Sequence, residues 1–167
     1  MVAQSSARRL GPGRDIAGLA ISIGLSLLAG AIGAAATFSS VNSWYPTLHK
    51  PDFNPPNAVF GPVWTALYLM MATAAWRVWR RHGPAGARTA LTLYGLQLLL
   101  NLAWSLIFFG LHRIALALVE ILALLALVAG TAASFWRRDR IAAALMIPYA
   151  AWVAFAATLN FAIWRLN

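Results

Sequence analysis

The sequence predicts an all-α fold, an integral membrane bundle of five transmembrane helices. Of its 167 residues, 61% are hydrophobic and only 10% are charged, which is too little polar surface for a water-soluble domain. Apolar runs of about 20 residues match the roughly 30 Å hydrocarbon core of a bilayer. They are continuous rather than alternating, which favours helices over barrel strands. The runs lie at about 16–38, 60–79, 90–109, 114–136 and 141–164.

These runs form one domain, 16–167, behind a flexible polar tail at 1–15. Arginines before the first apolar run resemble the start of a signal peptide, but the run is too long for one and predicts a retained helix. Small residues recur along this helix, which favours close helix packing within the chain. A homodimer through the same face stays open as an alternative. The small residues are Ala20, Gly24, Ala29 and Gly33, with Ser26 and Gly30 offset.

The net charge of +9 follows the predicted topology. Ten of the 13 basic residues fall at helix ends on one side of the membrane, and three, Lys50, Arg113 and Arg165, fall on the other. Basic residues concentrate on the cytoplasmic side of membrane proteins. We therefore expect an integral membrane protein that, if it lies in an inner membrane, has its N-terminus in the cytoplasm and its C-terminus outside. We expect no nucleic-acid partner.

Residues 39–59 form a long connection on the outer side. Loops of this length without secondary structure are usually functional or disordered. Three large aromatic residues and four prolines argue against disorder, because each proline restricts its own backbone and that of the residue before it. We expect a stiff lid. These residues are Trp44, Tyr45, Phe53 and the prolines at 46, 51, 55 and 56.

The apolar helices contain a few polar and indole groups that need partners. The amides of Gln97, Asn101 and Asn160 are costly in lipid unless they face the bundle interior. They can join helices or line a ligand cavity, and the sequence leaves both readings open. Trp64, Tyr68 and Trp104 fall in or near the outer half of the predicted bundle, and Trp152 lies near the middle of its helix. A cavity built from these groups would suit a flat, apolar, polycyclic ligand.

Glu120 is an intramembrane acid, which indicates a proton or cation site. The alternative is a shallow carboxylate that snorkels or bonds to its neighbours. The sequence has no cysteine, and its three histidines fall in separate loops without metal-ligand spacing. No paired carboxylates, phosphate-binding loop or nucleophile elbow is evident. We therefore expect no metal site and no required cofactor, and the residues themselves do not indicate an enzyme.

Four sequence blocks resemble the translocator protein family, also called tryptophan-rich sensory proteins or peripheral-type benzodiazepine receptors. They are WYPTLHKPDFNPP, VFGPVWTALYLM, QLLLNLAWSLIFFG and PYAAWVAFAATLNFAIWRLN. The resemblance implies a five-helix bundle that binds porphyrins, notably protoporphyrin IX. Animal members also bind cholesterol and synthetic drugs. It further implies a receptor or transporter with a regulatory or stress-response role.

By this resemblance, six residues would line the ligand cavity, and Trp44 of the lid would join them. The six are Trp64, Tyr68, Asn101, Trp104, Trp152 and Ala156. Some bacterial members degrade protoporphyrin in light, and Trp64 and Trp152 match the two tryptophans implicated there. A light-dependent enzyme is therefore one alternative function. A small proton-coupled exporter using Glu120 is another.

The chain departs from the family pattern at two positions. The cholesterol-recognition stretch near the C-terminus requires a tyrosine, where this chain has Phe161. Animal members have a tryptophan near the start of the fourth helix, where this chain has Leu116. The first departure puts strong sterol binding in question, and the second bears on drug selectivity.

Overall fold

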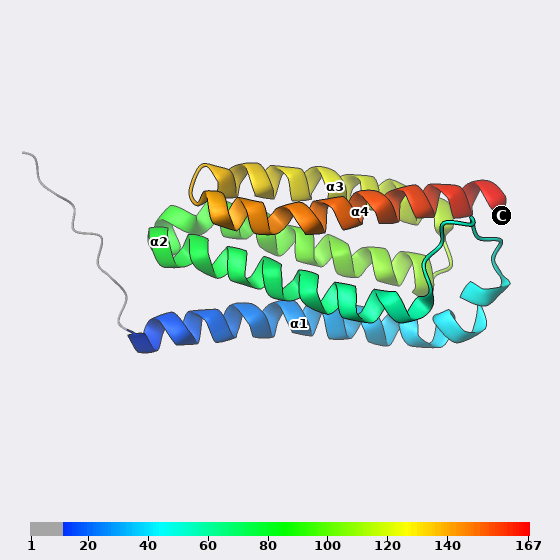
Figure 1. The fold of residues 1–167 in the computed structure, drawn as a ribbon, viewed down its shortest axis with the longest axis horizontal. Helices are drawn as coiled ribbons and strands as arrows, with labels where there is room; N and C mark the ends of the chain where they lie inside the picture. Colours follow the sequence, from blue (N-terminus) through cyan, green and yellow to red (C-terminus); the bar gives the residue numbers. More distant parts are fainter. Residues whose placement is uncertain (1–11) are drawn as a thin grey trace, which may run out of the picture.

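A computed structural model describes residues 12–167, and the regular secondary structure of this part of the chain is entirely helical, without a strand. The helices lie side by side along one long axis (Figure 1). The elements in order are α1 (Pro12–Ser43), the short 3₁₀ helix η1 (Tyr45–Thr47), α2 (Asn57–Ser105), the π-helix η2 (Leu106–Gly110), α3 (Ile114–Trp136) and α4 (Arg140–Leu166).

Within residues 12–167, four helices, rather than the predicted five, are long and apolar enough to cross a membrane. The predicted spans 60–79 and 90–109 both lie within one 54-residue helical stretch, Asn57–Gly110. The expected polar turn between them is reduced to one residue, Gly83, with φ 65° and ψ 178°. This backbone region is open almost only to glycine. Pro84 follows, and its fixed φ suits the first turn of a helix, so helical geometry resumes at once.

The two arms of α2, residues 57–82 and 84–105, pack against each other. Figure 1 shows them side by side, running in opposite directions from the bend. The Tyr68 hydroxyl on the first arm donates to Asn101 on the second. The Gln97 amide of the second arm also reaches the Met71 sulfur of the first. The helix therefore folds back on itself at Gly83.

Three other boundaries differ from the prediction. α1 begins at Pro12, so residues 12–15 of the expected tail are helical, while residues 1–11 lie outside the described part. α1 also extends to Ser43, and α2 starts at Asn57. The loop between them is therefore residues 44–56, shorter than the expected 39–59. α3 has the predicted bounds.

The small residues of α1 pack against the rest of the chain, as the sequence indicates. A Cβ added at Gly30 would lie 2.6 Å from the Tyr68 ring, and one at Gly33 would lie 3.4 Å from the Ser105 hydroxyl. Ser26 is fully buried. Gly24 has open space around it. The buried face therefore includes the residues that the sequence pattern placed as offset.

The two ends of the bundle differ in charge. The start of α1, the bend of α2 and the α3–α4 turn share one end, where Asp15 pairs with Arg80, and Asp139 pairs with Arg77 and Arg81. We call this the basic end. The loop at 44–56 and the C-terminus lie at the opposite, lid end (Figure 1).

Candidate functional site

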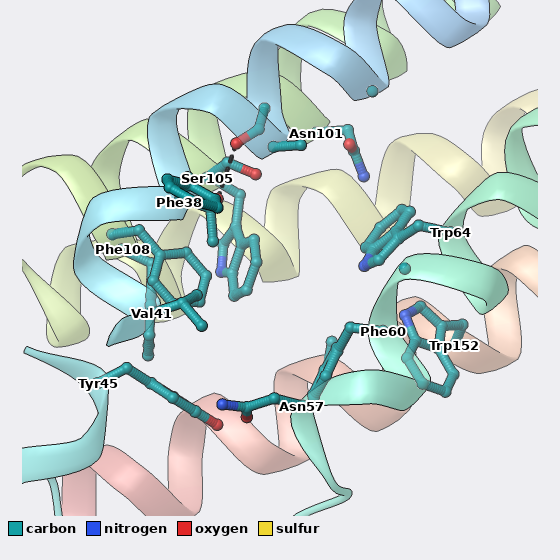
Figure 2. A pocket seen from close by; sticks show the side chains of 18 of the residues that line it. Phe38, Val41, Tyr45, Asn57, Phe60, Trp64, Asn101, Ser105, Phe108 and Trp152 are labelled. Carbon is teal, nitrogen blue, oxygen red and sulfur yellow. Dashed lines mark hydrogen bonds between the residues drawn. The ribbon is translucent and has the colours of Figure 1, made fainter. Parts of the chain in front are cut away.

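A cavity of about 770 Å³ lies in the lid half of the bundle. Side chains from α1, η1, both arms of α2, η2 and α4 form its wall, and no residue of α3 contributes. Most of the lining is aromatic or aliphatic (Figure 2). A volume of this size is within the range of about 300–1,000 Å³ typical of small-molecule sites.

Aromatic rings from α2 and α4 make one side of the cavity. The rings of Trp64 and Tyr68 are 5.6 Å apart and tilted by 31°. Across the helix boundary, Phe60 meets the edge of Trp152 at 5.9 Å. Figure 2 shows Trp64, Phe60 and Trp152 gathered around the same space. Ala156, one turn after Trp152, is small and leaves room beside the two indoles.

The polar groups of the cavity wall hydrogen-bond to one another. The Tyr68 hydroxyl donates to Asn101 Oδ1 at 2.6 Å, and Asn101 Nδ2 donates to the Tyr149 hydroxyl at 3.2 Å. Asn101 is only 4% exposed, and these two hydrogen bonds give its buried amide the partners that lipid could not provide. Asn101 therefore both joins helices and lines the cavity, and the two readings left open by the sequence apply together.

Trp104 and Asn160 form a second polar contact across helices. The Trp104 indole N–H donates to Asn160 Oδ1 at 3.1 Å, and Asn160 Nδ2 donates to the Ile114 carbonyl at 3.0 Å. The indole and the amide thus give each other the partner that polar groups of apolar helices need. This contact also ties α2, α3 and α4 together beside the cavity.

The structure brings together six of the seven predicted ligand-binding residues. The residues that line the cavity are Trp64, Tyr68, Asn101, Trp104, Trp152 and Ala156. Trp44 does not line it. Its ring stacks on His112 at 4.1 Å and meets the edge of Phe108 at 5.6 Å, so it supports the cavity wall from behind.

Glu120 lies on α3, away from the cavity lining. Both of its carboxylate oxygens are buried without a hydrogen-bond partner among the described residues. The expected alternative, a carboxylate bonded to neighbouring Trp, Asn or His112, therefore does not occur within residues 12–167.

The loop at 44–56 caps the cavity through Tyr45. The Tyr45 ring lines the cavity, and its hydroxyl donates to Asn54 Oδ1 at 2.7 Å, which closes the loop on itself. Burial raises the pKa of this phenol, and the bond to Asn54 opposes the rise only in part. Lys50 Nζ donates to the Tyr45 carbonyl at 2.8 Å. These contacts hold the aromatic cap in place.

The same loop is attached to the end of α4. The backbone N–H of His49 donates to Asn167 Oδ1, and Asn167 Nδ2 donates to the His49 carbonyl, both at 3.0 Å. Phe53 also meets the edge of Phe155 at 6.4 Å. The loop is thus fixed at both the η1 side and the α4 side.

The cavity is open between α1 and the first turns of α2. Near the basic end, α1 contacts the first arm of α2, where the Ser22 hydroxyl donates to the Ala72 carbonyl. Toward the lid end its contact shifts to η2, where the Ser40 hydroxyl donates to the Phe109 carbonyl. Phe38 on α1 and Gly61 on α2, which both line the cavity, are exposed. Exposed lining residues of both helices thus mark an opening of the cavity to the outside of the bundle.

Several lining residues were not singled out in the sequence. The sequence indicates Tyr45 only as a residue that stiffens the lid, and Phe60 and Phe109 are typical of any apolar membrane helix. Phe108 continues the helix face of Asn101 and Trp104, but the sequence does not mark it as a ligand-binding residue. Phe161, the departure in the sterol stretch, is half exposed and packs on Trp164 outside the cavity. The one available signal was proximity to the predicted residues, since Phe60 and Phe108 each lie four positions from a predicted tryptophan.

Comparison with known proteins assigns the chain to a family. The family model described as TspO/MBR matches residues 22–165. The chain is 39% identical to the tryptophan-rich protein TspO of Chlorobaculum tepidum, over 92% of this chain and 98% of that protein. It is 40% identical to the tryptophan-rich sensory protein of Cereibacter sphaeroides, over 82% and 87%.

The human translocator protein is also similar, at 42% identity over 74% of this chain and 75% of that protein. These matches confirm the resemblance carried by the four sequence blocks. Together with helices long enough to cross a bilayer, they show that the chain is an integral membrane protein and belongs to the TspO/MBR family.

Proposed function

We propose that this protein is a membrane receptor or transporter that binds a tetrapyrrole, such as protoporphyrin IX, in the cavity beneath the lid. The observation that carries the proposal is the composition of the wall, a group of aromatic rings with few polar atoms left free. A macrocycle of this class is flat, apolar and polycyclic. Offset stacking on indole rings stabilises such a ligand by about 0.5–1.5 kcal/mol per contact beyond area burial.

The family supports the broader part of this function. Membership of the TspO/MBR family, with sensory and translocator proteins among the relatives, supports a membrane receptor or regulatory role. We assign the finer part, the tetrapyrrole, from the cavity. The opening between α1 and α2 would admit an apolar ligand from the bilayer. Amide groups of Asn42 and Asn57 on the cavity lining would meet the ligand's carboxylates.

The topology of the proposed receptor follows from its charges. The two arms of α2 would each cross the membrane, which gives five crossings from four continuous helical elements. The basic end would then face the cytoplasm, and the lid end would face outward. Sterol-like or drug-like apolar ligands would compete for the same cavity, because its lining is mostly aromatic and aliphatic.

A titration with protoporphyrin IX tests the proposal. We expect Trp64→Phe and Trp152→Phe each to raise the Kd about two- to tenfold, as loss of a single aromatic contact requires. Trp136→Phe and Trp164→Phe are the matched controls, because these exposed tryptophans do not line the cavity. An unchanged Kd in both cavity variants would show that the ligand does not bind against Trp64 and Trp152 in this cavity.

A light-dependent porphyrin-degrading enzyme is a second candidate, favoured by the position of both Trp64 and Trp152 on the cavity wall. The same titration is run in light and in dark with analysis of products. Several turnovers per protein, without loss of protein tryptophans, would favour the enzyme. Stoichiometric bleaching would instead leave the receptor as the function.

A further inference from the structure

A second pocket, of about 270 Å³, lies at the basic end and is lined by Arg77, Arg80 and Arg81 of α2. Residues three and four positions apart share one face of a helix, which places the three guanidinium groups together. Like charges at this spacing repel each other. The arrangement therefore needs negative charge close by.

Two aspartates supply part of that charge and fix the arginines by one edge. Asp139 Oδ2 lies 3.1 Å from Nε of Arg77 and 3.1 Å from Nε of Arg81. Asp15 Oδ2 lies 3.2 Å from Nε of Arg80. Asp139 is itself held in place, because its Oδ1 accepts the backbone N–H groups of Ile141 and Ala142 at the start of α4.

The outer ends of two guanidinium groups remain available. A guanidinium has five N–H donors, and the ion pairs of Arg80 and Arg81 use Nε. Their Nη groups donate to no residue within 12–167, and the two side chains are 53% and 54% exposed. The aspartates thus orient donors that point away from them. Planar Arg donors of this kind fit phosphate oxygens in a bidentate manner.

The surroundings indicate that the phosphate belongs to a lipid. The described basic end carries eight arginines and two aspartates, a surplus of six positive charges. Trp76 and Trp136 lie at this level, and each contacts an arginine, Arg80 at 5.1 Å and Arg140 at 5.5 Å. Tryptophans of membrane proteins concentrate at headgroup depth. Basic pockets between helices at this depth suit anionic headgroups.

We propose that the Arg77–Arg80–Arg81 pocket binds the phosphate of an anionic phospholipid, such as phosphatidylglycerol, in the leaflet at the basic end. The site is separate from the cavity beneath the lid. Occupancy would neutralise the arginine face and link the bend of α2 to the turn before α4.

Native mass spectrometry of the full chain in mixed micelles tests this proposal. Phosphatidylglycerol and phosphatidylcholine compete at equal concentration, and retained lipid is counted. We expect wild type to prefer phosphatidylglycerol, and R80Q/R81Q to lose that preference about tenfold, as expected for loss of charge-assisted bonds. R88Q/R137Q is the matched control, because it removes two charges at the same end from exposed residues outside the pocket.

Three outcomes would overturn the proposal. The first is a wild type that shows no preference for phosphatidylglycerol. The second is an equal loss of preference in both double variants, which would mean that diffuse charge attraction binds the lipid. The third is inorganic phosphate that raises the thermal unfolding midpoint of wild type by as much as phosphatidylglycerol does, which would make free phosphate the ligand. Should R80Q/R81Q not fold, R80K/R81K keeps the charge, and we expect it to fold with a weaker preference, because lysine donates as a point charge.

Discussion

The Tyr68 hydroxyl donates a hydrogen bond to Asn101 Oδ1 at 2.6 Å, and this contact joins the two arms of α2 at the cavity wall. Both residues line the cavity, so one bond serves the fold and the candidate site. Asn101 passes the connection to Tyr149 on α4. The position of the aromatic wall therefore depends on a buried polar network.

Tyr68→Phe removes that hydroxyl and leaves Asn101 Oδ1 without its donor. Interhelical hydrogen bonds in membrane proteins contribute about 0.6 kcal/mol on average and up to ~1.7 kcal/mol. We expect Tyr68→Phe to lower the free energy of unfolding by an amount within that range. Unfolding in denaturant-containing micelles measures this decrease. Combined with Asn101→Ala, the loss should be less than additive. Fully additive losses would show that the two side chains do not interact.

Gly30→Ala should destabilise the packing of α1. Its new Cβ would lie 2.6 Å from the Tyr68 ring, which the bond to Asn101 restrains. Overpacking of this kind costs about 1–3 kcal/mol. Gly24→Ala is the control, because open space surrounds that position. Thermal unfolding in micelles should separate the two variants, and equal midpoints would contradict the close contact.

Asp139 should make stability depend on pH. Burial pushes the pKa of Asp139 up, but the Ala142 backbone N–H and the charges of Arg77 and Arg81 outweigh it, so the pKa lies below its usual value. A pKa lowered by folding gives stability that is present above the unfolded value, about 3.9, and is lost as pH falls through the folded value.

Thermal midpoints measured from about pH 7 down to pH 3 check this pH dependence. We expect Asp139→Asn to be less stable than wild type at neutral pH and to lose less on acidification. Asp52→Asn, in the exposed part of the loop, should follow wild type. A parallel fall for Asp139→Asn and wild type would show that Asp139 does not contribute.

Glu120→Gln should leave ligand affinity unchanged within about twofold, because Glu120 does not line the cavity and its neutralisation removes no contact to a ligand there. The carboxylate makes no hydrogen bond within the described residues, and α3 lines no part of the cavity. Protoporphyrin titrations and flux assays across pH provide the measurement. A pH-dependent flux that Glu120→Gln abolishes would support the proton-coupled exporter instead.

The sequence predicted the helical bundle and most of the cavity, for identifiable reasons. Amides and indoles in apolar helices need partners, so the sequence predicts that the few amides meet buried polar groups, and Asn160 accepts from Trp104. The four sequence blocks selected the six residues that converge on the cavity. Burial of polar groups in lipid is thus a strong constraint on which faces turn inward.

Other features depend on geometry that composition does not encode. The number of spanning elements depends on one backbone conformation, the non-helical φ and ψ of Gly83, where the two arms of α2 reverse direction without a longer loop between them. Trp44 points to His112 rather than to the cavity, because side-chain direction in a loop follows its exact path. Which residues of α1 line the cavity depends on the point along α1 where its contacts change from the first arm of α2 to η2.

A comparison of Ala156→Phe with Ala154→Phe tests the central claim most directly. Ala156 lines the cavity, whereas Ala154, two positions earlier on α4, is exposed on the outside of the bundle. We predict that Ala156→Phe weakens protoporphyrin IX binding by about 1–3 kcal/mol, roughly five- to 150-fold in Kd, and that Ala154→Phe binds like wild type. Equal affinity in the two variants, both folded, would contradict a ligand site in this cavity.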